Sequence, residues 1–132
     1  MKDLSAALRK LCMELDNKYD MNSGGCMYAA YMIAKNLKRL SIYYNVIMWY
    51  DAFDEPYHVS IKIGNYDTNP GHYFLHKSKK NIGFMEPKKI NQFTKEHEEF
   101  DWLWGRQNKK NVRDEINSFF RLYSKPIVYK AT

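Results

Sequence analysis

Leucines recur every three or four positions at the start of the chain, at Leu4, Leu8, Leu11 and Leu15. This spacing places them on one face and predicts an amphipathic helix over residues 3–18. After a glycine-containing break, the same spacing returns in Cys26, Ala30, Ile33, Leu37 and Leu40. It predicts a second helix over about residues 26–40, with basic side chains in its last turns, where they suit the negative end of the helix dipole.

Strand patterns follow the second helix. Residues 42–50 (IYYNVIMWY) are apolar on both alternating faces and rich in β-branched and aromatic side chains. Such a segment is typical of a central strand covered on both sides. Residues 58–63 (HVSIKI) alternate strictly, so three apolar side chains face one way and His58, Ser60 and Lys62 face the other.

A hairpin is predicted at the end of this second strand. Gly64-Asn65 is a favourable two-residue loop, and a short antiparallel strand should return from Tyr66 to about Asn69. We therefore expect a small antiparallel sheet behind the N-terminal helices.

The remainder of the chain carries weaker signals. Residues 70–90 predict loops with one further strand near residues 72–76, and residues 93–104 have helical character. Asn111 is a suitable cap for a last helix, whose apolar face consists of Val112, Ile116, Phe119 and Tyr123. Because no linker or internal repeat divides the chain, we expect one α+β domain over residues 1–132.

Composition narrows the class of protein. The 132 residues are 45% hydrophobic and 27% charged, as in ordinary globular domains, and no apolar run approaches the roughly 20 residues of a membrane span. The first residues lack the apolar stretch of a signal peptide, so we expect an intracellular protein without a membrane partner. Cys12 and Cys26 are then expected to be free thiols, and no cysteine spacing suggests a metal site or a cofactor.

The net charge of +6 is carried by the second half of the chain. Residues 1–76 hold eight Lys/Arg and eight Asp/Glu, whereas residues 77–132 hold thirteen and seven. A basic face formed by the Lys-rich residues 77–113 would suit nucleic acid or another acidic partner. Short clusters of like charge also occur on ordinary solvated surfaces, and both interpretations stay open.

Cys26 has the setting that an activated cysteine needs. A nucleophilic thiol must ionise, and a helix N-terminus and a nearby imidazolium both lower its pKa. Two glycines precede Cys26, with Ser23 as a plausible cap, so the residue falls in the first helical turn. There its main-chain amide can donate to the oxyanion of a tetrahedral intermediate, and the Asn22 side chain is a candidate second donor.

His58 is the candidate base, because it opens a strand on the polar face, directly after a loop. A third group must hold the imidazole, and Asp67 and Asn69 on the returning strand share its face. With Gly64-Asn65 as the loop, Asn69 is the nearer of the two, whereas a bulge would favour Asp67. Both candidates stay open on this geometry. His72 and His76 are four residues apart, but their surroundings do not predict the helix that would make them a metal site.

The segments GGCMYAAYMIAKNLKRL and HVSIKIGNYDTNPG resemble the Cys, His, Asp order of papain-like and transglutaminase-like proteins, in particular small phage-encoded ones. The resemblance spans about residues 22–71. It implies a papain-like α+β fold, with Cys26 opening a helix on the sheet, and it favours Asp67, within YDTN, as the third member.

That resemblance implies a cysteine-dependent hydrolase or acyltransferase, peptidase-like or amidase-like, which acts on a protein or peptide through a thioester. It would work in a host cytoplasm or in a virion. The alternative is a non-catalytic virion-associated, protein-binding or nucleic-acid-binding protein that keeps a papain-like frame.

Overall fold

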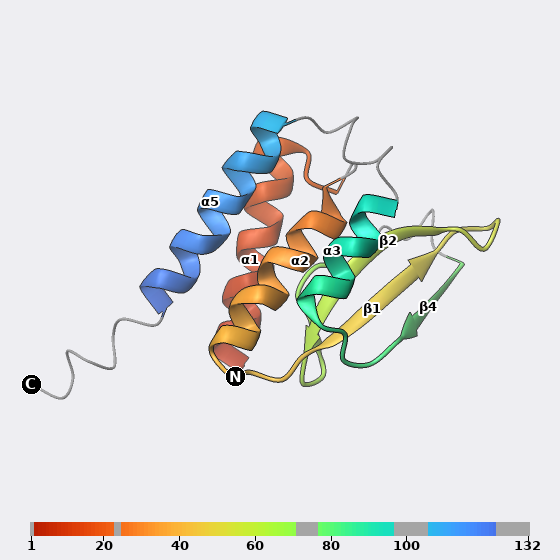
Figure 1. Cartoon of the computed structure of the whole chain (residues 1–132), viewed down its shortest axis with the longest axis horizontal. Helices are drawn as coiled ribbons and strands as arrows, with labels where there is room; N and C mark the ends of the chain where they lie inside the picture. The colour runs from red at the N-terminus through yellow and green to blue at the C-terminus, as the bar shows by residue number, and fades with distance from the viewer. Residues whose placement is uncertain (1, 23–24, 71–76, 97–105, 124–132) are drawn as a thin grey trace, which may run out of the picture.

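The computed structural model describes residues 2–22, 25–70, 77–96 and 106–123. These segments form an α+β fold (Figure 1). Its elements, in chain order, are α1 (Lys2–Tyr19), α2 (Cys26–Arg39), β1 (Asn45–Tyr50), β2 (Pro56–Ile63), β3 (Tyr66–Asp67), β4 (Ser78–Asn81), α3 (Pro87–Glu96) and α5 (Arg106–Tyr123). No helix among these segments is long and apolar enough to cross a membrane.

The strands form one antiparallel sheet in the order β3-β2-β1-β4. The predicted central strand is confirmed, since β1 lies between β2 and β4 and buries four consecutive side chains, from Val46 to Trp49. The predicted hairpin is also confirmed. Gly64 has a φ of +60°, which suits this tight turn, and Lys62 pairs with Asp67.

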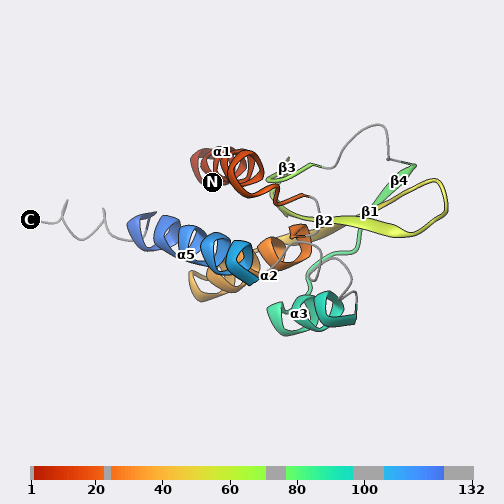
Figure 2. The ribbon, with the colours of Figure 1, turned by 90° about the horizontal axis from the view of Figure 1, so that it is seen from above.

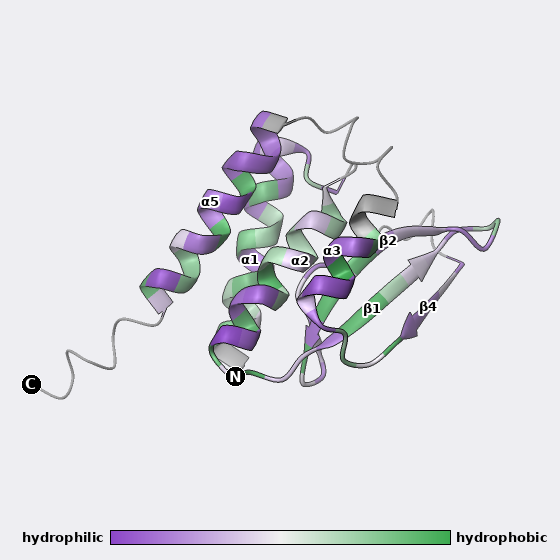
Figure 3. Cartoon of the chain, viewed as in Figure 1, coloured by the Kyte–Doolittle hydropathy of each residue, from purple (hydrophilic) through white to green (hydrophobic). Residues whose placement is uncertain are grey.

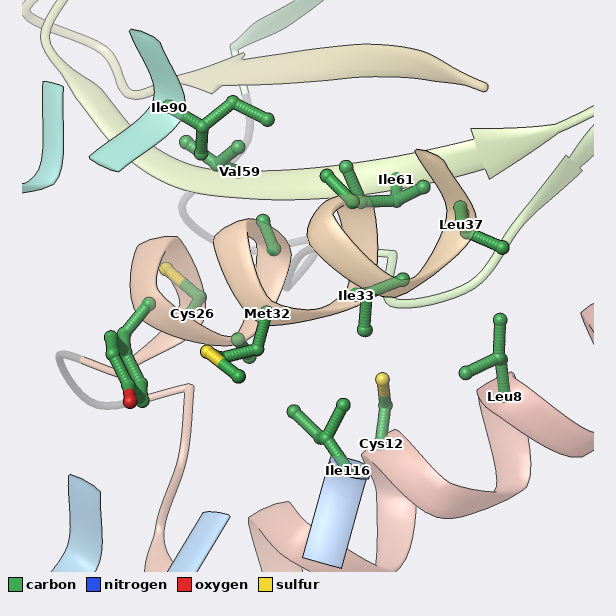
Figure 4. Close-up of a cluster of buried hydrophobic side chains, with 14 of the residues drawn as sticks. Leu8, Cys12, Cys26, Met32, Ile33, Leu37, Val59, Ile61, Ile90 and Ile116 are labelled. Atoms are coloured by element: carbon green, nitrogen blue, oxygen red, sulfur yellow. The ribbon is translucent and has the colours of Figure 1, made fainter. Parts of the chain in front are cut away.

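Helix α2 is the central helix of the fold. It packs on β2, while α3 and α5 flank it and α1 lies beside β3 and α5 (Figures 1 and 2). In Figure 4, Val59 and Ile61 of the sheet lie on one side of α2, and Leu8, Cys12 and Ile116 lie on the other. The predicted α1 stripe has Leu4, Leu8 and Leu15 fully buried in this core, with Leu11 packed at its margin. Each fully buried leucine stabilises the fold by roughly 1.5–3 kcal/mol.

The last two helices differ in part from the prediction. Helix α3 begins at Pro87, six residues before the helical segment predicted at residues 93–104, of which residues 97–104 lie outside the described residues. Helix α5 begins at Arg106 rather than near Asn111. Its buried stripe is Val112, Ile116 and Phe120, so the predicted Phe119 and Tyr123 are wrong as core positions: Phe119 packs only at the margin and Tyr123 is 41% exposed.

The pattern did not predict β4. Its sequence, SKKN, is polar throughout, and Figure 3 shows the strand as hydrophilic along its length. It forms because its main chain pairs with the edge of β1, from Ile47 to Tyr50. The strand predicted near residues 72–76 lies outside the described residues.

Candidate active site

Cys26 is the first residue of α2, as predicted, and it is 3% exposed. Gly25 caps the helix without a side-chain hydrogen bond, and its N–H bonds the carbonyl of Met21. The predicted cap, Ser23, lies outside the described residues. Because first-turn amides have no partner within the helix, this position surrounds the sulfur with donors. The Met27 amide is one of them, and it favours the thiolate.

The sulfur of Cys26 lies at an edge of β2 that β3 is too short to cover. Strand β3 pairs with Lys62 and Ile63, and the Thr68 amide adds one bond of 2.9 Å to the Ile61 carbonyl. Farther along the same edge, Cys26 Sγ lies 4.0 Å from the Tyr57 carbonyl oxygen, and the Val59 amide donates to the sulfur. The start of α2 therefore takes the place of a longer third strand.

His58 is buried next to this sulfur, at 2% exposure. Its Nε2 lies 2.5 Å from the main-chain oxygen of Asn69, which accepts the ring N–H. Because that contact fixes the proton on Nε2, the other ring nitrogen, Nδ1, is the one left for the Cys26 thiol. Trp49, directly opposite His58 in the β1–β2 pair, packs edge-on against the imidazole with ring centroids 6.1 Å apart.

The two side chains shift each other's pKa. Burial opposes the charged form of Cys26, but the hydrogen bond and charge of His58 and the Val59 and Met27 amides lower its pKa below the ordinary thiol value. Burial likewise opposes the charged form of His58, yet the Cys26 hydrogen bond and charge, with the Asn69 carbonyl, raise its pKa. These directions favour a thiolate next to an imidazolium, which is the state a nucleophilic cysteine requires.

The group that accepts the His58 ring N–H is neither of the two side chains predicted for it, those of Asp67 and Asn69. Asn69 supplies its main-chain carbonyl, and the described residues show no hydrogen bond from the Asp67 or Asn69 side chain to the imidazole. A carbonyl can accept the ring proton as an amide side chain does, although it adds no negative charge.

Within the described residues, Asp67 forms no hydrogen bond with the imidazole, but it positions the main chain of Asn69, whose carbonyl accepts one. Its Oδ1 accepts the Asn69 amide at 2.9 Å, and its Oδ2 accepts the Ser60 hydroxyl at 2.9 Å. Ser60 in turn accepts the Trp49 indole N–H at 3.1 Å. Asp67 also contributes through its charge, which helps to raise the pKa of His58. A chain of hydrogen bonds thus runs from β1 through β2 to the residue that orients His58.

Asn22 lies at the site, but its side chain pairs with that of Asn69. Asn69 Nδ2 donates to Asn22 Oδ1 at 2.9 Å, and Asn22 Nδ2 donates back at 3.2 Å. The Asn22 amide bonds Asp16 Oδ1 at 2.8 Å, which ties the segment to α1. The structure therefore gives Asn22 a positioning contact with Asn69. Its predicted role as an oxyanion donor stays a prediction, as does that of the Cys26 amide.

Sequence reasoning missed Trp49 and Ser60. The strand alternation puts Ser60 on the same face as His58, and this shared face is the signal that indicates Ser60 as a neighbour of the site. Trp49 lies opposite His58 only through the β1–β2 register, and that register cannot be obtained from one strand. The histidine pair at residues 72 and 76 lies outside the described residues, within which no group of three metal-ligating side chains occurs.

No protein-family model, curated protein or solved structure matches the chain.

Proposed function

We propose that the chain is a cysteine-dependent hydrolase or acyltransferase on a papain-like frame, with Cys26 as nucleophile and His58 as base. The observation that carries this proposal is the Cys26–His58 pair. The thiol opens a helix, its pKa is lowered despite burial, and the imidazole is held at its far nitrogen by the Asn69 carbonyl. A buried cysteine with a purely structural role has no need of a fixed imidazole.

In the proposed reaction, the Cys26 thiolate attacks the acyl carbon of an amide or ester. A bond from Sγ to that carbon forms, and the carbonyl electrons move to oxygen. When the tetrahedral intermediate collapses, the bond to the leaving amine or alcohol breaks and His58 gives that group its proton. His58 then takes a proton from water or an acceptor amine, which attacks the thioester and releases Cys26. Protein and peptide amides are the substrate class proposed.

Acylation by a small activated ester tests the proposal. Wild-type protein is incubated with p-nitrophenyl acetate, and the modified residue is located by peptide mass spectrometry. We expect an acetyl group on Cys26 that turns over in water, because attack and hydrolysis need only the thiolate and His58. A small ester suits a sulfur that is only 3% exposed.

Two variants control this experiment. Cys26→Ala should lose the adduct and its turnover, whereas Cys12→Ala should keep both, since Cys12 lies in the core on α1. Equal and slow acetylation of both cysteines in the wild-type protein would contradict the proposal. The Cys26–His58 pair would then be a structural unit of a non-catalytic protein.

A further inference from the structure

The outer face of α2 carries a second feature, which does not involve Cys26 or His58. A hollow of about 530 Å³ lies between α2 and α3, and another of about 460 Å³ lies on the side of α2 that faces α5. The two hollows share Lys35 and Arg39, one turn apart on α2. Each has the size of a small-molecule site. We name the two together the α2 groove.

Charge in the α2 groove is strongly one-sided. Its lining includes a single acidic residue, Glu86, and five cations: Lys35, Lys38, Arg39, Lys88 and Arg121. Glu86 forms an ion pair with Lys38, and among the described residues no second acidic side chain lines the α2 groove. This concentration of positive charge in a recess favours an anionic ligand.

The joint between α2 and α5 holds Arg39 in place. Asn36 is buried on α2, and its Oδ1 lies 3.3 Å from Arg39 Nη2. The Asn36 amide group donates to the Met32 carbonyl at 2.9 Å and to Asn117 Oδ1 on α5 at 3.1 Å. A guanidinium fixed by a buried amide loses less side-chain entropy on binding an anion than a free surface lysine does.

The first hollow also contains an aromatic ring. Tyr31 lines it together with Pro87, and Lys35 Nζ lies 6.0 Å from the Tyr31 ring centroid. An aromatic face beside cations is the combination that binds single-stranded nucleic acid, in which bases stack on rings and phosphates meet Lys and Arg. The two hollows adjoin at Lys35 and Arg39, so a strand of several nucleotides can occupy both, with its phosphates next to the shared cations.

We infer that the α2 groove binds single-stranded nucleic acid, with a base stacked on Tyr31 and phosphates at Lys35 and Arg39. The sequence predicts a basic face in residues 77–113, but among the described Lys and Arg side chains of that range only Lys88 lines the α2 groove. The cations at the centre of the groove come instead from the half of the chain with zero net charge.

Fluorescence anisotropy with a labelled oligothymidylate of about 12 nucleotides tests this inference, since single-strand sites cover about 4–16 nucleotides. The wild-type protein should bind it with an affinity that falls as salt rises. Lys35→Glu/Arg39→Glu should weaken binding by tenfold or more. The slope of log affinity against log salt should lose about 1.4, which corresponds to two single-strand phosphates.

The matched control is Lys79→Glu/Lys80→Glu on β4, which makes the same change of charge at exposed residues outside the groove. This variant should keep binding within about threefold at physiological salt, because distant surface charges are screened there. Thermal unfolding checks that both variants fold. If the α2 variant does not fold, Lys35→Gln/Arg39→Gln replaces it, with the same direction of effect expected.

Four outcomes would overturn the inference. One is an equal loss in the two charge-matched variants, which would show a response to net charge rather than a site. Another is tighter binding of a duplex of the same length. The third is absence of oligonucleotide binding at low salt, and the fourth is displacement of the oligonucleotide by polyglutamate at an equal concentration of charge.

Discussion

The two cysteines are equally buried, yet their surroundings shift their pKa values in opposite directions. Cys12 on α1 is 1% exposed and Cys26 is 3% exposed, and both belong to the same core cluster (Figure 4). Burial raises the pKa of Cys12 to about 12, with help from the charges of Asp67 and Asp16. The pKa of Cys26 is lowered although burial alone would raise it.

The difference lies in the polar partners that each element offers. Cys12 lies in the middle of α1, where main-chain N–H groups donate to main-chain carbonyls of the same helix. Its neighbours in Figure 4 are aliphatic. Cys26 sits at a helix start and faces an uncovered strand edge and an imidazole. Exposure therefore does not separate the thiol of raised pKa from the thiol of lowered pKa in this protein. Unpaired main-chain donors and a positioned histidine do.

His58→Ala is expected to have the largest effect, because it removes the partner that distinguishes Cys26. The pKa of Cys26 should rise, and alkylation by iodoacetamide at mildly acidic pH should slow by about 100-fold, because much less of the thiol is ionised there. In a pH series, the alkylation rate of the wild-type protein should rise at a pH below the ordinary thiol pKa. In His58→Ala the same rise should occur above it. Peptide mass spectrometry separates Cys26 from Cys12, which serves as the internal standard.

The ultraviolet absorbance of the thiolate gives a second measure that does not depend on reagent access. Cys26 should titrate below an ordinary thiol in the wild-type protein and above it in His58→Ala. A thiolate titration unchanged by His58→Ala would show that the imidazole does not set the Cys26 pKa.

Cys12→Ser should have the next largest effect, and on stability only. It buries a hydroxyl among aliphatic side chains, which costs about 1–3 kcal/mol of unfolding free energy. Urea denaturation measures the loss, and Cys12→Ala, which removes the sulfur without adding a polar group, is the control. A changed rate of Cys26 alkylation in either variant would show that the two thiols are not independent.

Asp67→Asn should have the smallest effect, and it acts on both cysteines. The Asp67 charge raises the pKa of Cys12 and of His58, so its loss should lower both. The amide oxygen can still accept the Asn69 N–H. Because a less basic imidazole leaves less positive charge next to Cys26, alkylation of Cys26 should slow by about threefold.

Asp16→Asn is the matched control for this substitution. Asp16 also raises the pKa of Cys12, but it is not among the groups that shift His58. Its substitution should leave Cys26 alkylation unchanged. An equal slowing in the two variants would contradict a specific role for Asp67.

The first two helices and the hairpin could be predicted because their signals are local. The leucine stripe defines α1, the Gly-Gly-Cys break defines the start of α2, and Gly64-Asn65 defines the turn that pairs Lys62 with Asp67. Strand β4 has no such signal, since its pairing with β1 depends on a partner about thirty residues away. Local pattern fails where tertiary contact decides the conformation.

Of the candidate site, the side chains of Cys26 and His58 could be predicted, but the main-chain contact that orients His58 could not. Cys26 follows from its place at a helix start, and His58 from the phase of its strand. The contact between His58 and Asn69 could not be predicted, because it uses a group that every residue has. The α2 groove was hidden for a related reason: it joins Lys35 and Arg39 to Lys88 and Arg121, which are far apart in the sequence.

The Asn69 carbonyl also affects how this site would look in a complete map of tolerated substitutions. No exchange of one amino acid for another deletes a main-chain oxygen. Apart from proline, which would also remove the N–H that Asp67 accepts, substitutions at position 69 would register the loss of its side-chain pairing with Asn22. Genetic variation can therefore reveal Cys26 and His58, while the main-chain oxygen that orients the imidazole stays silent and is detected only through its geometry.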